Sequence, residues 1–156
     1  MANVMRTQDT ISAREAEMFW TIDGRRYLIA QAKNFEGRID KDKVEVPILG
    51  RRMKGHKSVG MSGTWSATIY YNQPLIREAL QRFKNTGVDE YFEIQATNKD
   101  LESSAGRQTV IFYGCNTDGG ILAKFDTEGD ILDEEVSGTF EDFKIPENFK
   151  IIKEMQ

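Results

Sequence analysis

The residues whose types and spacing come nearest to a known chemistry form a basic, glycine-rich run in the first half of the chain. Gly50 and Gly55 are followed by His56, Lys57 and Ser58, close to the G-x-x-x-x-G-K-[ST] loop that binds nucleotide phosphates. That loop needs its lysine directly after the second glycine, and a helix must begin there so that backbone N–H groups hold the anion. Here a histidine is inserted, and the β-branched and aromatic residues that follow indicate a strand. The run therefore does not predict a nucleotide site.

Other signatures of catalysis or metal binding are weak. His56 is the single histidine and stands among cations, which disfavour both its protonation and metal binding. Cys115 is the single cysteine, which excludes an internal disulfide and a CxxC motif. The acidic run 126–130 has its glycine in the fourth place, whereas an EF-hand calcium loop needs it in the sixth. A carboxylate pair for glycoside hydrolysis is left open by the sequence, although clustered acids usually form a solvated face. We predict a protein that is not an enzyme and holds no metal or cofactor.

Length and composition predict one globular domain, residues 1–156. With 39% hydrophobic and 29% charged residues, the chain can bury a core without disulfides or metals. Its apolar runs fall short of the roughly 18 residues needed to cross a bilayer, and residues 1–6 lack the apolar core of a signal peptide. We therefore expect a cytosolic protein. The net charge of −4 argues against nucleic acid as the main partner, although a local basic patch can override net charge.

The elements that must position these residues are mainly β-strands. Asp23-Gly24 is a strong signal for a tight hairpin turn, Gly138 is expected to mark a bulge, and Pro146 is expected to end regular structure. Residues 1–13 are expected to be a flexible lead-in and residues 147–156 a C-terminal tail. Strands are predicted at 16–22, 25–34, 35–40, 43–49, 64–71, 90–97, 107–113, 121–126 and 131–143.

One helix is predicted over about residues 74–86. Pro74 suits its first turn, which needs no backbone donor, and Gly87 suits the residue just after it. An apolar stripe at helical spacing would face a sheet. The predicted solvated face consists of Arg77, Glu78, Gln81, Arg82 and Lys84. Strands with one embedded helix predict a mainly β (α+β) fold, a β-sandwich or barrel with a flanking helix.

The distribution of charge suggests that copies of the chain bind one another. The run from Ile48 to Gly60 holds four of the 21 Lys and Arg residues and lies between predicted strands, which predicts a long surface arm. A second, acidic segment lies near the C-terminus, and complementary patches on separate surfaces set the register of association. When one patch meets a different patch on the next copy, the contact runs head to tail and produces closed rings or open filaments.

Several short segments carry a resemblance to a known family. They are Asp9-Thr10-Ile11-Ser12; Gly50-Arg51-Arg52-Met53 with Gly55-His56-Lys57; Gly63-Thr64 with Ser66-Ala67-Thr68; Ser103-Ser104 with Gly106-Arg107; and Glu134-Glu135-Val136 with Thr139-Phe140-Glu141-Asp142-Phe143 and Pro146-Glu147. In this order they resemble the tail tube proteins of contractile-tailed phages and of PBSX-like defective prophages, the XkdM-like family. Trp65 departs from the pattern, because a small residue is expected at that position.

The resemblance implies a structural subunit with a β-sandwich or barrel and a flanking helix. Such subunits form six-fold rings that stack into a tube inside a contractile sheath, and DNA passes through the lumen without specific binding. The implied partners are other copies of the chain and the sheath, baseplate or initiator proteins. The implied location is the host cytoplasm during assembly and then the tail of a virion or tail-like particle. A net acidic chain suits such a conduit, because it would repel phosphate.

The resemblance also implies which residues touch neighbouring subunits. The implied contact residues of the arm are Arg51, Arg52, Met53, Lys54, His56 and Lys57. We expect their acidic partners to be Asp133, Glu134 and Glu135. The alternative is a small nucleic-acid-binding module that uses the basic loop 50–58, with Trp65, Tyr70 and Tyr71 as stacking surfaces. Against it, Trp65 alternates with Ala67 and Ile69, which is typical of a core or interface face.

Overall fold

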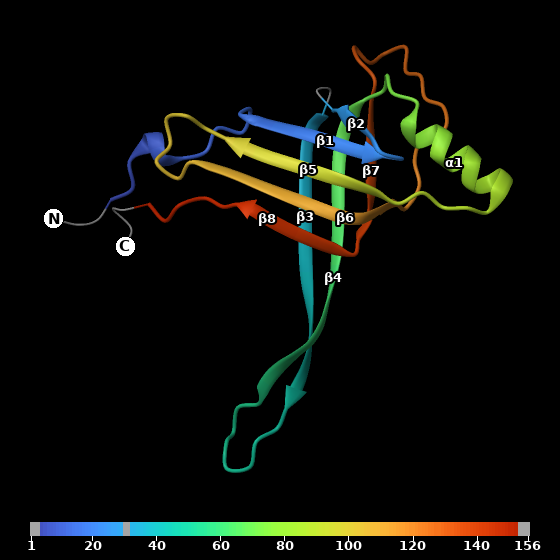
Figure 1. Ribbon diagram of the computed structural model, residues 1–156. Helices are drawn as coiled ribbons and strands as arrows, with labels where there is room; N and C mark the ends of the chain where they lie inside the picture. Colours follow the sequence, from blue (N-terminus) through green and yellow to red (C-terminus); the bar gives the residue numbers. More distant parts are fainter. Residues whose placement is uncertain (1–3, 30–31, 153–156) are drawn as a thin grey trace. The chain divides into compact units, whose positions relative to one another are not determined.

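The computed structural model describes residues 4–29 and 32–152, and most of its elements are β-strands (Figure 1). The elements are a 3-10 turn at Thr7–Asp9, β1 Ala16–Ile22, β2 Arg25–Leu28, β3 Ala32–Val46, β4 Gly55–Tyr70, α1 Leu75–Thr86, β5 Phe92–Lys99, β6 Arg107–Thr117, β7 Asp133–Phe140 and β8 Asp142–Glu147. Every strand pair with a defined register is antiparallel. The predicted mainly β fold with one helix is confirmed.

The chain groups into two units, each assembled from segments that are far apart in the sequence. The first unit consists of Met1–Ala32, Tyr91–Cys115 and Asp142–Gln156. The second unit consists of Lys33–Glu90 and Asn116–Glu141. Strand β6 crosses from one unit to the other along the chain. Neither unit is a contiguous stretch of the chain, so no single linker separates them. The single domain predicted over residues 1–156 stays a prediction.

The sheet of the first unit has the order β2-β1-β5-β6-β8. Asp23 and Gly24 both have positive φ, at 51° and 75°, and Ile22 pairs with Arg25 across them. This is the predicted two-residue hairpin turn, which needs a left-handed backbone at both central positions. One face of the sheet is apolar, and the rings of Trp20 and Phe92 lie 5.3 Å apart on it.

The lead-in that we expected to be flexible is bonded to the rest of the first unit from Arg6 to Ser12. The Asp9 side chain is buried and accepts hydrogen bonds from the Ser104 hydroxyl at 2.7 Å and the Ser104 N–H at 3.1 Å. Ser103 Oγ donates to the backbone oxygen of Asp9, and the Ser12 N–H donates to Asp100. The segment is polar in sequence, but its polar groups are satisfied by a distant loop rather than by water. Residues 1–3 lie outside the described residues.

The second unit is built on an antiparallel ladder between β4 and β7 that runs from Gly63–Phe140 to Tyr70–Asp133. The buried side chains of β4 are Trp65, Ala67 and Ile69, so the predicted core face of this strand is confirmed. The Trp65 indole N–H donates to the Thr139 carbonyl oxygen at 3.2 Å. On the other side of β4 lies β3, and the last residues of β6 pair with β7.

Gly138 serves close packing rather than a bulge. The β4–β7 register passes through Trp65–Gly138 without a shift, so the bulge prediction is wrong. A Cβ at this position would overlap the backbone oxygen of Asn116 and would lie 2.9 Å from Trp65 Nε1. The glycine therefore allows the end of β6 to approach β7 beside the Trp65 ring.

Several predicted strand limits also differ from the structure. The strand predicted at 25–34 ends at Leu28, the segments 35–40 and 43–49 fall on the single strand β3, which ends at Val46, and the strand predicted at 131–143 is divided into β7 and β8. Residues 121–126 form no strand, because the segment 118–132 between β6 and β7 has no strand beside it to complete a ladder. Residues 55–60, expected in an irregular arm, belong to β4. Pro146 lies inside β8, whose pairing partner is β6, and proline is tolerated on such an edge strand.

Helix α1 lies within the predicted limits. It ends at Gly87, whose φ of 71° is left-handed and whose N–H bonds the Phe83 oxygen. Its buried residue Ile76 packs against Gly120, where a Cβ would come within 2.6 Å of Ile76 Cγ2. The helix is thereby seated on the chain that follows β6. No helix among residues 4–29 and 32–152 has both the length and the apolar character needed to cross a membrane.

The close packing at Gly138 generates a stability prediction. We expect Gly138→Ala to lower the free energy of unfolding by about 2 kcal/mol, because an added methyl group overpacks a filled site. Gly60→Ala is the matched control, since its Cβ would meet only an Asp42 carboxylate oxygen at 3.4 Å. Urea denaturation of both variants measures the difference. Equal stabilities would contradict the packing role of Gly138.

The Asp9 contacts generate a prediction about pH. Hydrogen bonds from Arg6 and then from Ser104 lower the pKa of Asp9 from 3.8 to about 2. Because this pKa is depressed in the folded chain, the charged form stabilises docking above about pH 4, and that contribution is lost as the pH falls toward 2. We expect Asp9→Asn to speed amide hydrogen exchange in residues 6–12 at neutral pH. Glu102→Gln, which removes an exposed charge from the facing loop, is expected to leave that exchange unchanged.

Candidate functional site

The most distinctive feature of the second unit is a long two-stranded arm, residues 36–62. Strands β3 and β4 continue well past the ladder that β4 forms with β7 (Figure 1). Residues 36–45 and 56–62 are all exposed. An isolated hairpin of this kind is marginal in water, because neither of its faces is covered. The apolar side chains on it, such as Val59 and Met61, thus have no core to fill within the described chain.

The end of the arm, residues 47–54, is here called the tip. Its turn is closed by a hydrogen bond from the Arg51 N–H to the Ile48 oxygen at 3.1 Å, and Gly50 has a φ of 85°. Three large apolar side chains are exposed at the tip: Ile48, Leu49 and Met53. Leu49 is fully exposed, at 103% of its reference area. Clustered apolar exposure at the end of a projecting element is typical of an interaction site.

The structure brings the six predicted arm residues together at this end of the hairpin. Four of them lie in the tip: Arg51, Arg52, Met53 and Lys54. His56 and Lys57 follow Gly55, the first residue of β4. All six are exposed. The Lys54 ammonium lies 3.2 Å from Glu45 of β3, so its charge is partly neutralised within the arm. Within the described chain, neither Arg51 nor Arg52 forms a side-chain ion pair, which leaves two uncompensated cations at the tip.

The three acidic residues expected to bind the arm lie at the far end of the second unit from the tip (Figure 1). Glu134 is buried, and one of its oxygens accepts a hydrogen bond from Arg77 Nη1 at 2.7 Å. Asp133 lies 2.9 Å from Lys33 Nζ, and this contact lowers the pKa of Asp133 below its ordinary value. Glu135 is exposed. Two of the three carboxylates are therefore paired within their own chain.

Arg77 is a structural residue that the sequence reasoning missed. We predicted it on the solvated face of α1, but its guanidinium also donates to the backbone oxygens of Gln73 and Ile121 and lies 4.4 Å from the Tyr71 ring centre. It thus ties α1 to β7 and to the segment 118–132. Its place directly after the buried Ile76, at the edge of the apolar stripe, is the signal that could have indicated partial burial.

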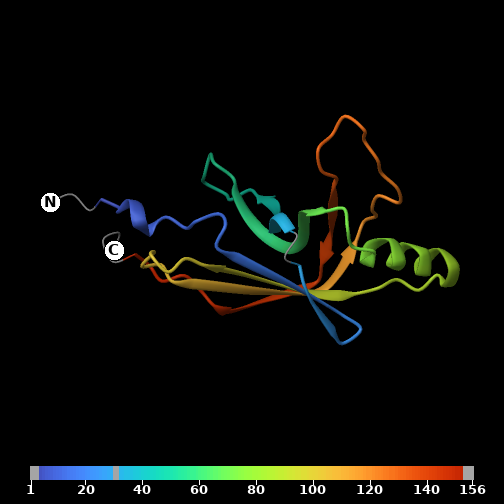
Figure 2. The same cartoon turned by 90° about the horizontal axis from the view of Figure 1, so that it is seen from above.

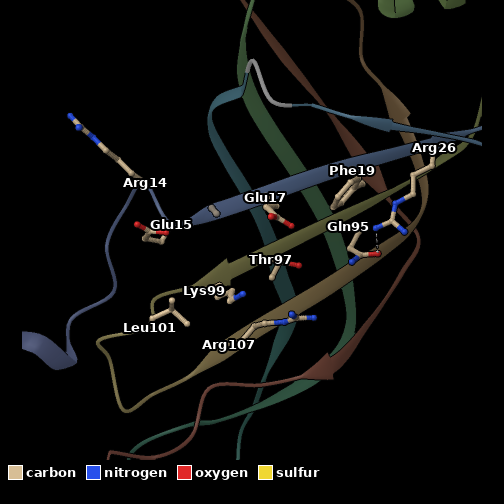
Figure 3. Close-up of a pocket in the computed structure, with 11 residues that line it drawn as sticks. Arg14, Glu15, Glu17, Phe19, Arg26, Gln95, Thr97, Lys99, Leu101 and Arg107 are labelled. Atoms are coloured by element: carbon tan, nitrogen blue, oxygen red, sulfur yellow. Dashed lines mark hydrogen bonds between the residues drawn. The ribbon is translucent and has the colours of Figure 1, made fainter.

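The first unit carries a separate hollow of about 450 Å³ on the polar face of β1, β5 and β6 (Figure 3). Arg26 lies 3.9 Å from the Phe19 ring centre and donates to Gln95 at 3.5 Å. Thr97, which lines the hollow, is itself buried, and its hydroxyl lies 3.1 Å from that of Thr109 on the neighbouring strand. The lining has charges of both signs but lacks histidine and cysteine, so it offers no nucleophile with an adjacent base. We interpret it as a solvated sheet face.

Three further observations concern cysteine reactivity, nucleic acid stacking and metal binding. Cys115 is buried, and burial raises the pKa of its thiol to about 12, so it is unreactive at neutral pH. Trp65 is 2% exposed and cannot stack on a nucleic acid base, which removes one surface on which the nucleic-acid-binding alternative relied. Across the described residues, no group of three or more metal-binding side chains is assembled.

Comparison with known proteins identifies the family. A family model described as phage tail tube protein matches residues 3–147. The phage-like element PBSX protein XkdM of Bacillus subtilis (strain 168) is 39% identical over 143 residues, which cover 92% of this chain and 95% of XkdM. The resemblance found in the sequence is confirmed.

Two solved structures share the fold at low sequence identity. A chain in the baseplate of the anti-feeding prophage (AFP) has a TM-score of 0.67 and 9% identity, covering 90% of this chain and 97% of its own length. The SPP1 tail tube protein has a TM-score of 0.62 and 9% identity, covering 92% of this chain and 81% of its own length. At these identities the comparison shows a common fold.

The Arg77–Glu134 pair generates a prediction. Arg77→Leu leaves a buried carboxylate without its cation, and we expect it to lower the free energy of unfolding by about 3 kcal/mol. Lys84→Leu, on the exposed side of α1, is the control and is expected to change stability little. The double variant Arg77→Leu with Glu134→Leu should recover part of the loss in chemical denaturation. A single variant as stable as the parent chain would show that the pair does not hold α1.

Proposed function

This chain belongs to the phage tail tube protein family, and from that membership we propose that its tubes are stacks of six-membered rings inside a contractile sheath. The family role is structural and not enzymatic, as the sequence predicted. In this proposal the lumen of the tube conducts DNA without specific binding. The net charge of −4 supports that function, because an acidic wall repels phosphate and lets the duplex slide.

The observation that carries the assembly proposal is the arm. It extends a two-stranded hairpin past its own sheet and exposes apolar side chains along its length and at its tip. A hairpin of this kind gains a stable environment when a second surface covers it. A neighbouring copy of the same chain supplies such a surface in every ring and every stack, as the head-to-tail geometry of closed rings and filaments requires.

We assign the contact with the neighbouring subunit to Arg51, Arg52, Met53, Lys54, His56 and Lys57. Among the acidic residues first expected to receive them, Asp133 and Glu134 already have cationic partners in their own chain. Of these three acidic residues, we therefore keep Glu135, whose side chain is exposed, as the one that can contact a neighbouring subunit.

The remaining partners follow from the family and from the assemblies in which the shared fold occurs. The AFP chain belongs to a baseplate, and the SPP1 chain to a tail tube. We propose that this chain likewise meets a sheath along the tube and baseplate or initiator proteins at its end. It would assemble in the host cytoplasm and then reside in the tail of a virion or tail-like particle.

Electron microscopy of the purified chain at high concentration tests the proposal. We expect hollow tubes of uniform width, and end-on class averages with six subunits. The same sample with the purified baseplate of its particle tests assembly from an initiator. Averages with another symmetry would contradict the six-membered ring. Small particles under both conditions, with salt-sensitive DNA binding, would contradict the tube and favour the nucleic-acid-binding alternative.

The arm generates its own prediction. We expect Arg51→Glu with Arg52→Glu to reduce sedimentable tubes by about tenfold or more, because like charges now meet at the contact. The monomer should keep its stability, since both side chains are exposed and unpaired within the described chain. Gln81→Glu with Lys84→Glu, on the exposed side of α1, is the control for a general gain of negative charge. Normal tubes from the arm variant would refute the contact role.

A further inference from the structure

The segment between β6 and β7, residues 118–132, is a second exposed and unusual surface of the second unit. It forms an open loop without regular structure, beside the start of α1 (Figures 1 and 2). Three large apolar side chains point to solvent there: Leu122, Phe125 and Ile131. Phe125 is 86% exposed. Such a patch on a single chain is typical of a surface that is covered in an assembly.

The base of this loop is fixed to the unit. Arg77 donates to the Ile121 oxygen at 3.3 Å, and the Tyr71 hydroxyl donates to the Leu122 oxygen at 3.4 Å. Where the loop joins β7, the backbone oxygen of Asp133 accepts a hydrogen bond from Lys124 Nζ at 2.9 Å. The loop is therefore presented from an anchored base. A surface held in place before binding loses less conformational entropy when a partner covers it.

The charge of the loop is opposite to that of the arm tip. Asp126, Glu128 and Asp130 are exposed, and the one cation among them, Lys124, is directed toward Asp133 within the unit. The tip carries the uncompensated cations Arg51 and Arg52. Both surfaces thus combine exposed apolar side chains with charges, and the charges are of opposite sign. Complementary charge around apolar contacts sets the register between partners.

The two surfaces lie at opposite ends of the second unit (Figure 1). The tip of a chain therefore does not contact the loop of the same chain, and the tip that covers a loop comes from another copy. Each copy has one tip and one loop, so the contact is heterologous and repeats from copy to copy. We propose that the arm tip of one copy docks on the 118–132 loop of the next copy, an inference that rests on the proposed tube function. In this contact Leu49 and Met53 pack against Leu122 and Phe125. Arg51 and Arg52 face Asp126 and Asp130.

A charge swap tests this pairing. Asp126→Lys with Asp130→Lys is expected to reduce sedimentable tubes by about tenfold or more, as the tip reversal does. Combining the loop reversal with Arg51→Glu and Arg52→Glu in one chain is expected to restore tubes, because opposite charges face each other again. Glu78→Lys with Gln81→Lys, on the exposed side of α1, controls for a general gain of positive charge and is expected to leave tubes intact.

Cysteine cross-linking tests the same contact without relying on assembly yield. Chains with Leu49→Cys are mixed with chains carrying Phe125→Cys under mild oxidation, and we expect a disulfide-linked pair of the two. The natural Cys115 is buried and is not expected to cross-link. Each single variant oxidised alone measures the background of other disulfides. Leu49→Cys mixed with Lys84→Cys, on α1, is expected to remain unlinked.

The outcomes separate this inference from the proposed function. If the parent chain forms tubes and the tip reversal prevents them, but the loop reversal has no effect and no Leu49–Phe125 link forms, the arm contact stands and the loop is not its acceptor. If the parent chain forms no tubes with or without a baseplate, the tube proposal fails. The cross-link in concentrated solution then decides the tip–loop contact by itself.

Discussion

The β4–β7 ladder is the interaction on which the rest of the second unit depends. Eight paired residues fix β4 from Gly63 to Tyr70, and the inward side chains of this stretch are closed off around Trp65. With its last half held in this way, β4 can project its first half beyond the sheet and carry β3 with it. The arm can therefore be long because the short β4–β7 ladder at its base is well packed.

The same ladder brings the buried carboxylate of Glu134 next to Arg77 of α1. Because β7 begins at Asp133, its first residues meet the start of α1, where Arg77 compensates the buried Glu134 carboxylate. Arg77 also holds the base of the 118–132 loop. One guanidinium therefore joins a helix, a strand and a loop. An apolar residue in its place would leave Glu134 charged and unpaired in the interior, which is costly.

Stability and assembly are served by different residues in this protein. Buried aromatic and aliphatic side chains and paired charges hold each unit, whereas the apolar and cationic side chains of the arm are exposed in the single chain. Such exposure is a liability for a monomer and an advantage for a subunit, because covering it drives association. This division matches a family whose role is structural.

The sequence by itself determined the local elements and the family. Backbone preference and hydrophobic periodicity are set by residues close together in the sequence. They predicted the Asp23-Gly24 turn, the strand at 16–22, the helix at about 74–86 and the core face of Trp65. Only the tertiary structure decided what depends on distant partners. Asp9 is buried because Ser104 bonds it, Gly138 is required because Asn116 passes beside it, and the Glu134 carboxylate is paired with Arg77 of its own chain. Residues 121–126 have strand-like composition but no adjacent strand, and a strand exists only when its backbone groups are paired.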